Sequence, residues 1–183
     1  MKRFSVMTSI LLLCGIMIKS ISAQDMDKSS GSASFLAQLV ADDLQSSGKK
    51  IIELADAMPA DDYSWRPEEG VRSVSEVFVH IAMSNYYFQA LLGGKMPENF
   101  DKDAEKNMTN KEDIINYLKQ SFEYTQKFLS GYGDTDYGTM IDTPFGKFSK
   151  QQILMLMATH AHEHLGQSIA YARTNHIVPP WSK

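Results

Sequence analysis

Four stretches of the chain repeat apolar residues at intervals of three and four, the spacing that places side chains on one face of an α-helix. These stretches lie between Ala33 and Pro59, between Ser73 and Gly93, between Thr109 and Gly131, and between Ser149 and Asn175. Four amphipathic helices, each with one face to bury, pack most simply as a four-helix bundle, either antiparallel or with a crossover connection. The sequence therefore predicts an all-α fold, with residues 33–183 forming a single domain.

Three of the four stretches begin with a capping-box pattern, in which Ser or Thr is followed three residues later by Glu or Gln. The three pairs are Ser73 with Glu76, Thr109 with Glu112, and Ser149 with Gln152. Each pair predicts a helix start, because the two side chains satisfy backbone N–H groups that have no partner within the helix.

The connections between the predicted helices carry turn signals and charge. Residues 141–148 contain Pro144 and Gly146 in an apolar setting, which predicts a tight turn or small hairpin that is too short to make a sheet. The charge-rich stretch Pro97–Asn110 predicts a solvated loop.

The first residues follow a different pattern from the helices. Two basic residues at positions 2 and 3 precede an apolar run over residues 10–18, and small residues follow as far as Ala23. This order is typical of a secretory signal peptide, so we expect cleavage after Ala23 and export to the periplasm or the outside of the cell. The apolar run has about half the length of a membrane-spanning helix, and no membrane span is expected. Residues 24–32 are small and polar and predict a flexible leader.

Cys14 is the only cysteine in the chain. A second interpretation makes it a lipid-anchored N-terminus, although Leu13 stands where such signals place a small residue. Cleavage after Ala23 removes this cysteine and thereby excludes disulfide bonds, a cysteine nucleophile and thiolate metal ligands. It also removes three of the 18 basic residues, which leaves 15 against 22 acidic residues, a net charge of −7. We expect no nucleic-acid partner, because no basic stripe remains to contact a phosphate backbone.

His160 and His164 are the polar residues that carry the strongest chemical signal. Residues four apart differ by about 40° around a helix, so both imidazoles share a face, among the apolar residues of the fourth predicted helix. His162 points to the opposite side. Burying two imidazoles without partners costs roughly 1–3 kcal/mol each, and this spacing lets both rings converge on one ion. We therefore expect the pair to bind a divalent metal ion.

A third ligand has to come from another segment. His80 lies at the margin of the apolar face of the second predicted helix, where its side chain can turn inward, although a single histidine there is more often a core residue. His176, beyond the fourth predicted helix, is a poor candidate. Three histidines leave room for water or a substrate, and they suit zinc, nickel, iron or copper. A metalloprotease motif is excluded because Gly166 stands where its second histidine belongs.

Other inward polar residues have roles that the sequence leaves open. Asp43 and Gln167 fall on inward faces, where either can orient a ligand imidazole, but the interpretation we favour for both is an interhelical hydrogen bond unrelated to a metal. Trp65 and Tyr171 are expected to belong to the core.

Several motifs resemble those of the DinB-like, YfiT-related metal-binding superfamily. They are Trp65-Arg66-Pro67, the segment from Arg72 to His80, the block His160-Ala-His-Glu-His-Leu-Gly-Gln167, and Pro179-Pro180. The resemblance implies a four-helix bundle, often dimeric, that holds zinc, nickel or a similar ion with three histidines, here His80, His160 and His164. Leu165 departs from the pattern, because many members have arginine after the last histidine ligand.

The resemblance implies several functions and selects none of them. Relatives include transferases and isomerases that use small thiols, and others proposed to be hydrolases. Two hypotheses therefore stay open: a metal-dependent hydrolase or thiol-type transferase acting on an unknown small molecule, and a non-catalytic metal or small-ligand binding protein of the cell envelope. A metal-free bundle with hydrogen-bonded histidines is the third.

Overall fold

The computed structural model describes residues 34–98 and 100–182. The predicted signal peptide over residues 1–23, the leader over residues 24–32 and the alternative anchor at Cys14 lie outside these residues. Within the described segments, no helix is long and apolar enough to cross a membrane.

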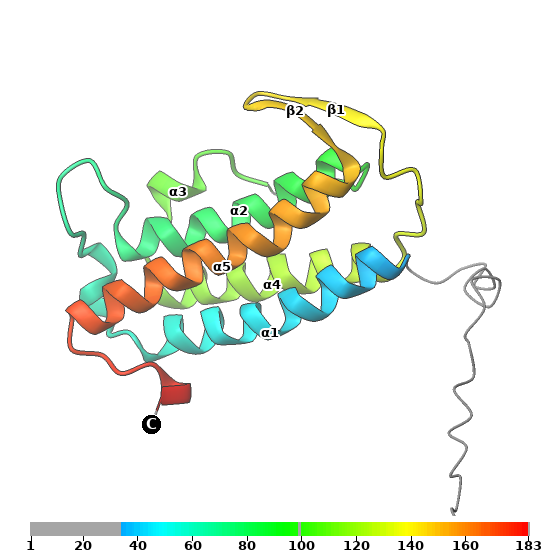
Figure 1. Cartoon of the computed structure of the whole chain (residues 1–183). Coiled ribbons are helices and arrows are strands. Elements are labelled where there is room, and N and C mark those ends of the chain that lie inside the picture. Colours follow the sequence, from blue (N-terminus) through cyan, green and yellow to red (C-terminus); the bar gives the residue numbers. More distant parts are fainter. Residues whose placement is uncertain (1–33, 99, 183) are drawn as a thin grey trace, which may run out of the picture. The chain divides into compact units, whose positions relative to one another are not determined.

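Four long helices form a bundle, as the apolar repeats predict (Figure 1). They are α1 (Phe35–Ala57), α2 (Val74–Leu91), α4 (Lys111–Ser130) and α5 (Lys150–Thr174). Helix α1 packs against α4 and α5, and α2 packs against the same two helices, so α1 and α2 lie on one diagonal of the bundle. Helices α1 and α5 run in one direction and α2 and α4 in the other (Figure 1). The bundle is therefore of the crossover type.

The crossover segment, described over residues 92–98 and 100–110, returns along α2 to the start of α4 (Figure 1). This stretch includes the short helix α3 (Ala104–Asn107), in which Ala104 is buried against the core. The described residues of Pro97–Asn110 are mostly exposed, as expected of a solvated stretch, but packing of α3 on α2 turns Ala104 and Glu105 toward the bundle. That packing brings Glu105 toward the histidines.

Helix starts follow the predicted capping signals at Ser73 and Ser149, where both hydrogen bonds of the capping box are present. The predicted cap at Thr109 is wrong by one residue. Asn110 caps α4 instead, and its side-chain oxygen accepts a hydrogen bond from the backbone N–H of Asp113. Lys111 donates to backbone oxygens near the end of α1 and so ties the start of α4 to that helix.

A hairpin of β1 (Met140–Thr143) and β2 (Gly146–Ser149) joins α4 to α5. The predicted hairpin is confirmed, but it does make a sheet, one of two antiparallel strands. Gly146 has a φ of 135°, a conformation that glycine adopts without strain and that closes the turn. Ser149 ends β2 and also caps α5, so the strand leads directly into the histidine-bearing helix. Two short 3₁₀ helices, Ala60–Ser64 and Pro180–Ser182, complete the described elements.

Candidate metal centre

His160 and His164 lie one turn apart on α5 and face the interior, as their spacing predicts. Their Nε2 atoms are 3.2 Å apart. His164 is buried, with 8% of its surface exposed, and His160 is half-buried. The capping box at Ser149 fixes where α5 begins, and the packing of this helix in the bundle turns the two histidines inward.

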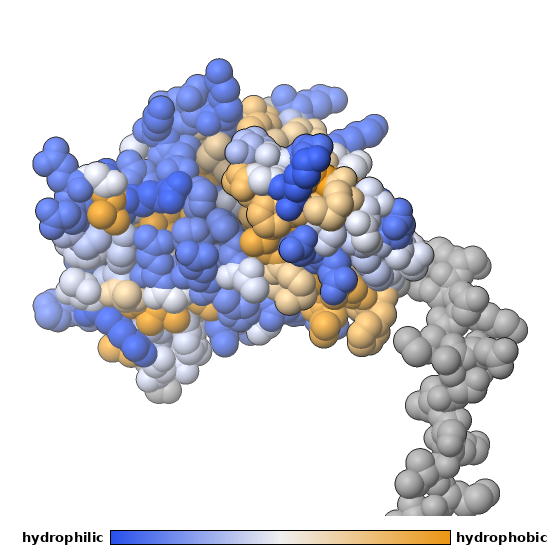
Figure 2. All heavy atoms as spheres, turned by 45° about the horizontal axis from the view of Figure 1, so that its top comes forward, coloured by the Kyte–Doolittle hydropathy of each residue, from blue (hydrophilic) through white to orange (hydrophobic). Residues whose placement is uncertain are grey.

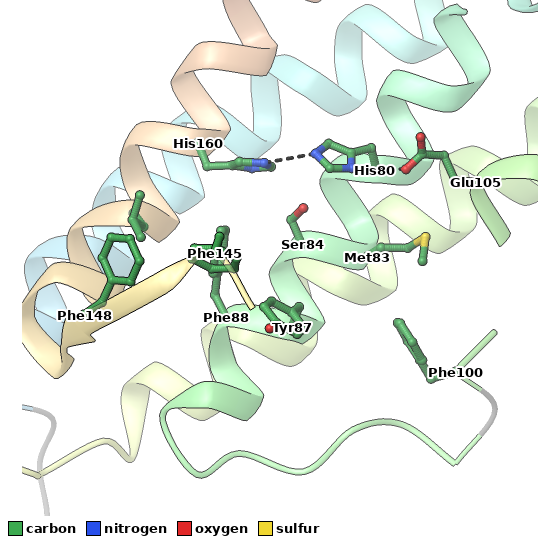
Figure 3. A pocket seen from close by; sticks show the side chains of 11 residues that line it. His80, Met83, Ser84, Tyr87, Phe88, Phe100, Glu105, Phe145, Phe148 and His160 are labelled. Atoms are coloured by element: carbon green, nitrogen blue, oxygen red, sulfur yellow. Dashed lines mark hydrogen bonds and ion pairs between the residues drawn. The ribbon is translucent and has the colours of Figure 1, made fainter. Parts of the chain in front are cut away.

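His80 comes from α2 and completes the group. Its Nε2 atom lies 3.2 Å from Nε2 of His160, and Figure 3 shows these two rings facing each other across the gap between their helices. Taking one ring nitrogen from each of His80, His160 and His164, all three nitrogens lie within 4.8 Å of one another. The structure thus brings together the three histidines that the sequence and the resemblance had selected.

The imidazoles of His80 and His164, the two outer rings on either side of His160, are held through their Nδ1 atoms. Nδ1 of His80 donates to a carboxylate oxygen of Glu105 at 3.1 Å, and Nδ1 of His164 donates to Oε1 of Gln167 at 2.7 Å. A neutral imidazole carries one N–H, so a proton on Nδ1 leaves a lone pair on Nε2. Both Nε2 lone pairs then point at the same small volume, next to Nε2 of His160.

Further hydrogen bonds fix the two acceptors. Nε2 of Gln167 donates to the hydroxyl of Tyr171 at 3.0 Å, and that hydroxyl donates to the backbone oxygen of Arg72 at 3.1 Å. Arg72 in turn donates from Nε to Glu105 at 2.7 Å. A continuous network therefore links Gln167 on α5, the acceptor of His164, with Glu105 on α3, the acceptor of His80.

Burial favours the neutral form of two of the imidazoles, those of His160 and His80. It is the main cause that lowers the pKa of His160 to about 3, and the neighbouring His164, His80 and Arg72 act in the same direction. Burial and the Arg72 cation also lower the pKa of His80, outweighing the opposite effect of Glu105. Neutral imidazole is the form that binds a metal ion.

The geometry fits a single divalent ion. Nitrogen ligands at about 2.0–2.1 Å from a tetrahedral ion lie about 3.3–3.4 Å from each other. The Nε2 separations of 3.2 Å from His160 to His80 and from His160 to His164 are close to that value, and all three ligand nitrogens lie within 4.8 Å of one another. Two lone pairs aimed at one point repel each other unless a cation or a shared proton lies between them, so these residues suit a metal ion. Three histidine ligands also leave room for a further ligand.

The two candidate orienting residues have different roles. The side chain of Gln167 contacts His164 and Tyr171 on its own helix, so the interhelical hydrogen bond that we favoured for it is wrong. For Asp43 the favoured interpretation is confirmed, because its carboxylate contacts His162, on the outer face of α5, at 3.0 Å. His176 is exposed and lies outside the histidine group.

Glu105 is the residue that the sequence argument missed. It lies in the stretch expected to be a solvated loop, 25 positions from His80. No local spacing relates the two residues, because only the packing of α3 on α2 brings them together. The core positions of Tyr171 and Trp65 are confirmed, with Tyr171 buried and Trp65 packed edge-on against its ring.

A pocket of about 460 Å³ opens beside His80 and His160. Figure 3 shows the two histidines and Glu105 at one end of it, with aromatic side chains from α2 and the hairpin at the other. Its volume lies within the range of small-molecule sites.

Comparison with known proteins places the fold. The chain matches a solved DinB-like protein from Bacillus cereus (20% identity, TM-score 0.63, covering 75% of this chain and 93% of that one). It also matches a DinB-like protein from Bacillus subtilis (22% identity, TM-score 0.60, covering 76% of this chain and 94% of that one). A conserved protein from Enterococcus faecalis matches with 19% identity and a TM-score of 0.60, covering 74% of this chain and 94% of that one. Among curated proteins none matches significantly.

The family comparison covers the part of the chain that holds the site. The family model of the DinB superfamily matches residues 43–168, which include His80, Glu105, His160, His164 and Gln167. That range is more than half of the chain and spans α2 and α4 completely and most of α1 and α5. The chain belongs to the DinB superfamily.

Proposed function

We propose that the protein binds one divalent metal ion through His80, His160 and His164 and presents it to a small molecule in the adjoining pocket. The observation that carries this proposal is the convergence of the Nε2 atoms of His80 and His164 on His160, with both outer rings held through Nδ1. Such paired hydrogen bonding of the ring nitrogen that faces away from the ion is typical of metal-ligating histidines.

The chemistry of the site depends on what a metal can supply. A divalent ion held by three imidazoles acts as a Lewis acid, which suits hydrolysis or transfer to a thiol-type acceptor. Glu105 and Gln167 orient the ligand rings, and aromatic side chains line the far end of the pocket. The donor set suits zinc or nickel, and also iron or copper.

A non-catalytic metal or small-ligand binding protein is the second candidate. It is favoured by one observation, that Glu105 is the only carboxylate lining the pocket in the part of the chain described, and that it already binds both His80 and Arg72. That arrangement leaves the site without an unengaged carboxylate to act as an acid or base. The metal-loaded protein, tested on ester, amide and thiol-conjugation substrates, separates the two: metal-dependent turnover supports the enzyme, and its absence across all three classes supports the binding protein.

Metal content tests the proposal directly. Protein purified without added metal and then loaded should hold one equivalent of zinc or nickel by elemental analysis, and His160→Ala should hold less than a tenth of that. His162→Ala is the matched control, since His162 lies on the same helix but contacts Asp43 on the outer face, and it should keep the full equivalent. A His160→Ala variant that retained one equivalent would overturn the assignment.

We extend the proposal to export, which the N-terminal residues support. The basic, apolar and small residues in positions 2–23 have the order of a signal peptide. Mass spectrometry of protein recovered from the periplasm or medium should show an N-terminus at Gln24. Full-length chain in the cytoplasm alone would contradict export without affecting the metal site.

A further inference from the structure

The pocket beside the histidines is apolar over most of its surface. Its wall is formed by side chains from α2, α5, the hairpin and the crossover segment, chiefly Met83, Tyr87, Phe88, Phe100, Phe148 and Leu156. These residues come from segments far apart in the sequence, so the wall exists only in the folded protein. Apolar walls with few polar groups are the usual surroundings of a bound small molecule.

The hairpin extends this wall outward. Phe145 at its turn packs against Phe148 with ring centroids 5.3 Å apart and reaches Tyr87 on α2 at 6.2 Å. Phe145 is nevertheless 52% exposed, so a large aromatic surface faces solvent at the mouth of the pocket. Figure 2, which turns the hairpin side toward the viewer, shows hydrophobic surface gathered there among hydrophilic residues. A ligand lying against this surface would remove it from water.

The imidazoles and the carboxylate of the lining lie at one end of the pocket. His80, His160 and Glu105 lie together in Figure 3, with Ser84 and Met83 between the two ends. The remaining lining residues are aromatic apart from Leu156, and among them only Tyr87 has a polar group, its hydroxyl. The carboxylate of Glu105 forms an ion pair with Arg72, whose Nε lies 2.7 Å from Oε1 of Glu105. The lining residues farther from the histidines carry no charge that could pair with a charged ligand body, so burying such a body there would cost free energy.

We infer the class of ligand that this site takes: a small amphiphile with an uncharged alkyl or aryl body and one metal-binding head group at its end. The body lies between α2, α5 and the hairpin, and the head lies at His80 and His160. This inference rests on the proposed metal site for the head group, whereas the choice of body rests on the pocket wall alone.

The test uses straight-chain hydroxamates from acetohydroxamate to octanohydroxamate, titrated calorimetrically into zinc-loaded protein. The hydroxamate is a metal-binding head, and only the tail changes along the series. We expect Kd to fall about three- to four-fold for each added methylene until the pocket is full, because each buried CH₂ contributes about 0.8 kcal/mol. A Kd that does not change with chain length would overturn the inference.

A second titration separates this inference from the metal proposal. 1-Octanol, which lacks a strong metal-binding head, should bind the metal-free protein, since the wall does not depend on the ion. If the protein held no zinc but bound octanol, the metal proposal would fail, and the inference that the pocket takes an apolar ligand body would stand. A third outcome is that the protein holds zinc, does not bind octanol, and binds the longer hydroxamates no more tightly than acetohydroxamate. In that case the inferred ligand class would fail and the metal proposal would stand.

Variants then locate the tail. Phe148→Ser should weaken octanohydroxamate binding about ten-fold and leave acetohydroxamate binding unchanged, because only the longer ligand reaches the hairpin. Phe35→Ser is the matched control, since Phe35 is 75% exposed on α1, away from the pocket, and should change neither affinity. If circular dichroism shows that Phe148→Ser does not fold, Met83→Gln replaces it. An equal effect on both ligands would contradict the inferred position of the tail.

Discussion

His164 donates from Nδ1 to Oε1 of Gln167 at 2.7 Å, within one turn of α5, and this bond directs its other ring nitrogen toward His160. Gln167→Leu removes the acceptor, so the ring can rotate or carry its proton on Nε2 instead. We expect metal affinity to fall about 10- to 100-fold, as in other sites that lose such a partner. Competition with a chromophoric chelator measures the change.

The control for this variant is Gln151→Leu, at an exposed position near the start of the same helix. It should keep the wild-type affinity. If Gln167→Leu also kept it, the packing of α5 alone would fix the ring, and the hydrogen bond would have no role in metal binding.

Glu105 should orient His80 in the same way. Glu105→Ala removes the acceptor of Nδ1 and leaves Arg72 without its carboxylate, and we expect metal binding to weaken about ten-fold. Glu105→Gln, whose amide oxygen still accepts a hydrogen bond, should recover part of that loss. The exposed Glu112→Ala is the control, and the same chelator competition is the measurement. Equal affinities for the Ala and Gln variants would argue against an orienting bond.

Metal removal should lower thermal stability. An ion at 100 times its Kd stabilises the native state by about 2.7 kcal/mol. In a domain of this size each kcal/mol shifts Tm by about 2–4 °C, so a chelator should lower Tm by about 5–10 °C. His160→Ala should melt at a temperature that the chelator does not change. A chelator effect of the same size in that variant would show that the stabilising ion binds elsewhere.

Glu76 should make stability depend on pH through the cap of α2. Its Oε2 accepts from the backbone N–H of Ser73 at 2.7 Å, and Arg66 donates to Oε1 at 3.1 Å. Burial raises the pKa of Glu76, but these bonds outweigh it, so the pKa lies below 4.5 in the folded state. The stabilisation is therefore present above the unfolded pKa and is lost as pH falls through the lower folded pKa.

Urea unfolding of Glu76→Gln measures this dependence. The variant should lose about 0.5 kcal/mol of unfolding free energy at pH 7, and the difference from wild type should shrink as pH falls below about 4.5. Glu68→Gln, at an exposed position before α2, should show no such dependence. A difference that stayed constant with pH would mean that the charge of Glu76 is not involved.

Two helical glycines should respond oppositely to alanine. A Cβ at Gly48 would lie 2.7 Å from the ring of Phe122, where α1 packs on α4, so Gly48→Ala should destabilise the fold by about 1–3 kcal/mol. A Cβ at Gly166 meets no atom within 4 Å, and Gly166→Ala should stabilise α5 by about 0.5–1 kcal/mol. Urea unfolding gives both values. Stabilisation by Gly48→Ala would show that Phe122 moves without cost.

The sequence by itself determined the features that depend on neighbouring residues in one helix. The apolar spacing located all four long helices, the capping boxes located the starts of α2 and α5, and the interval of four placed His160 and His164 on one face. These are local properties, since helix geometry fixes the relative direction of side chains one turn apart. At α4 the local signal was ambiguous, because Asn110 and Thr109 are both good caps at neighbouring positions.

Only the tertiary structure decided which distant residues meet the histidine pair. His80 lies 80 positions from His160, and Glu105 reaches it from a four-residue helix in the crossover segment. The same packing brought Asp43 of α1 to His162, whereas the contact between Gln167 and His164 lies within one turn of α5. Contacts of this kind depend on how the bundle buries its apolar faces as a whole, because that packing fixes the rotation of each helix and the path of the crossover.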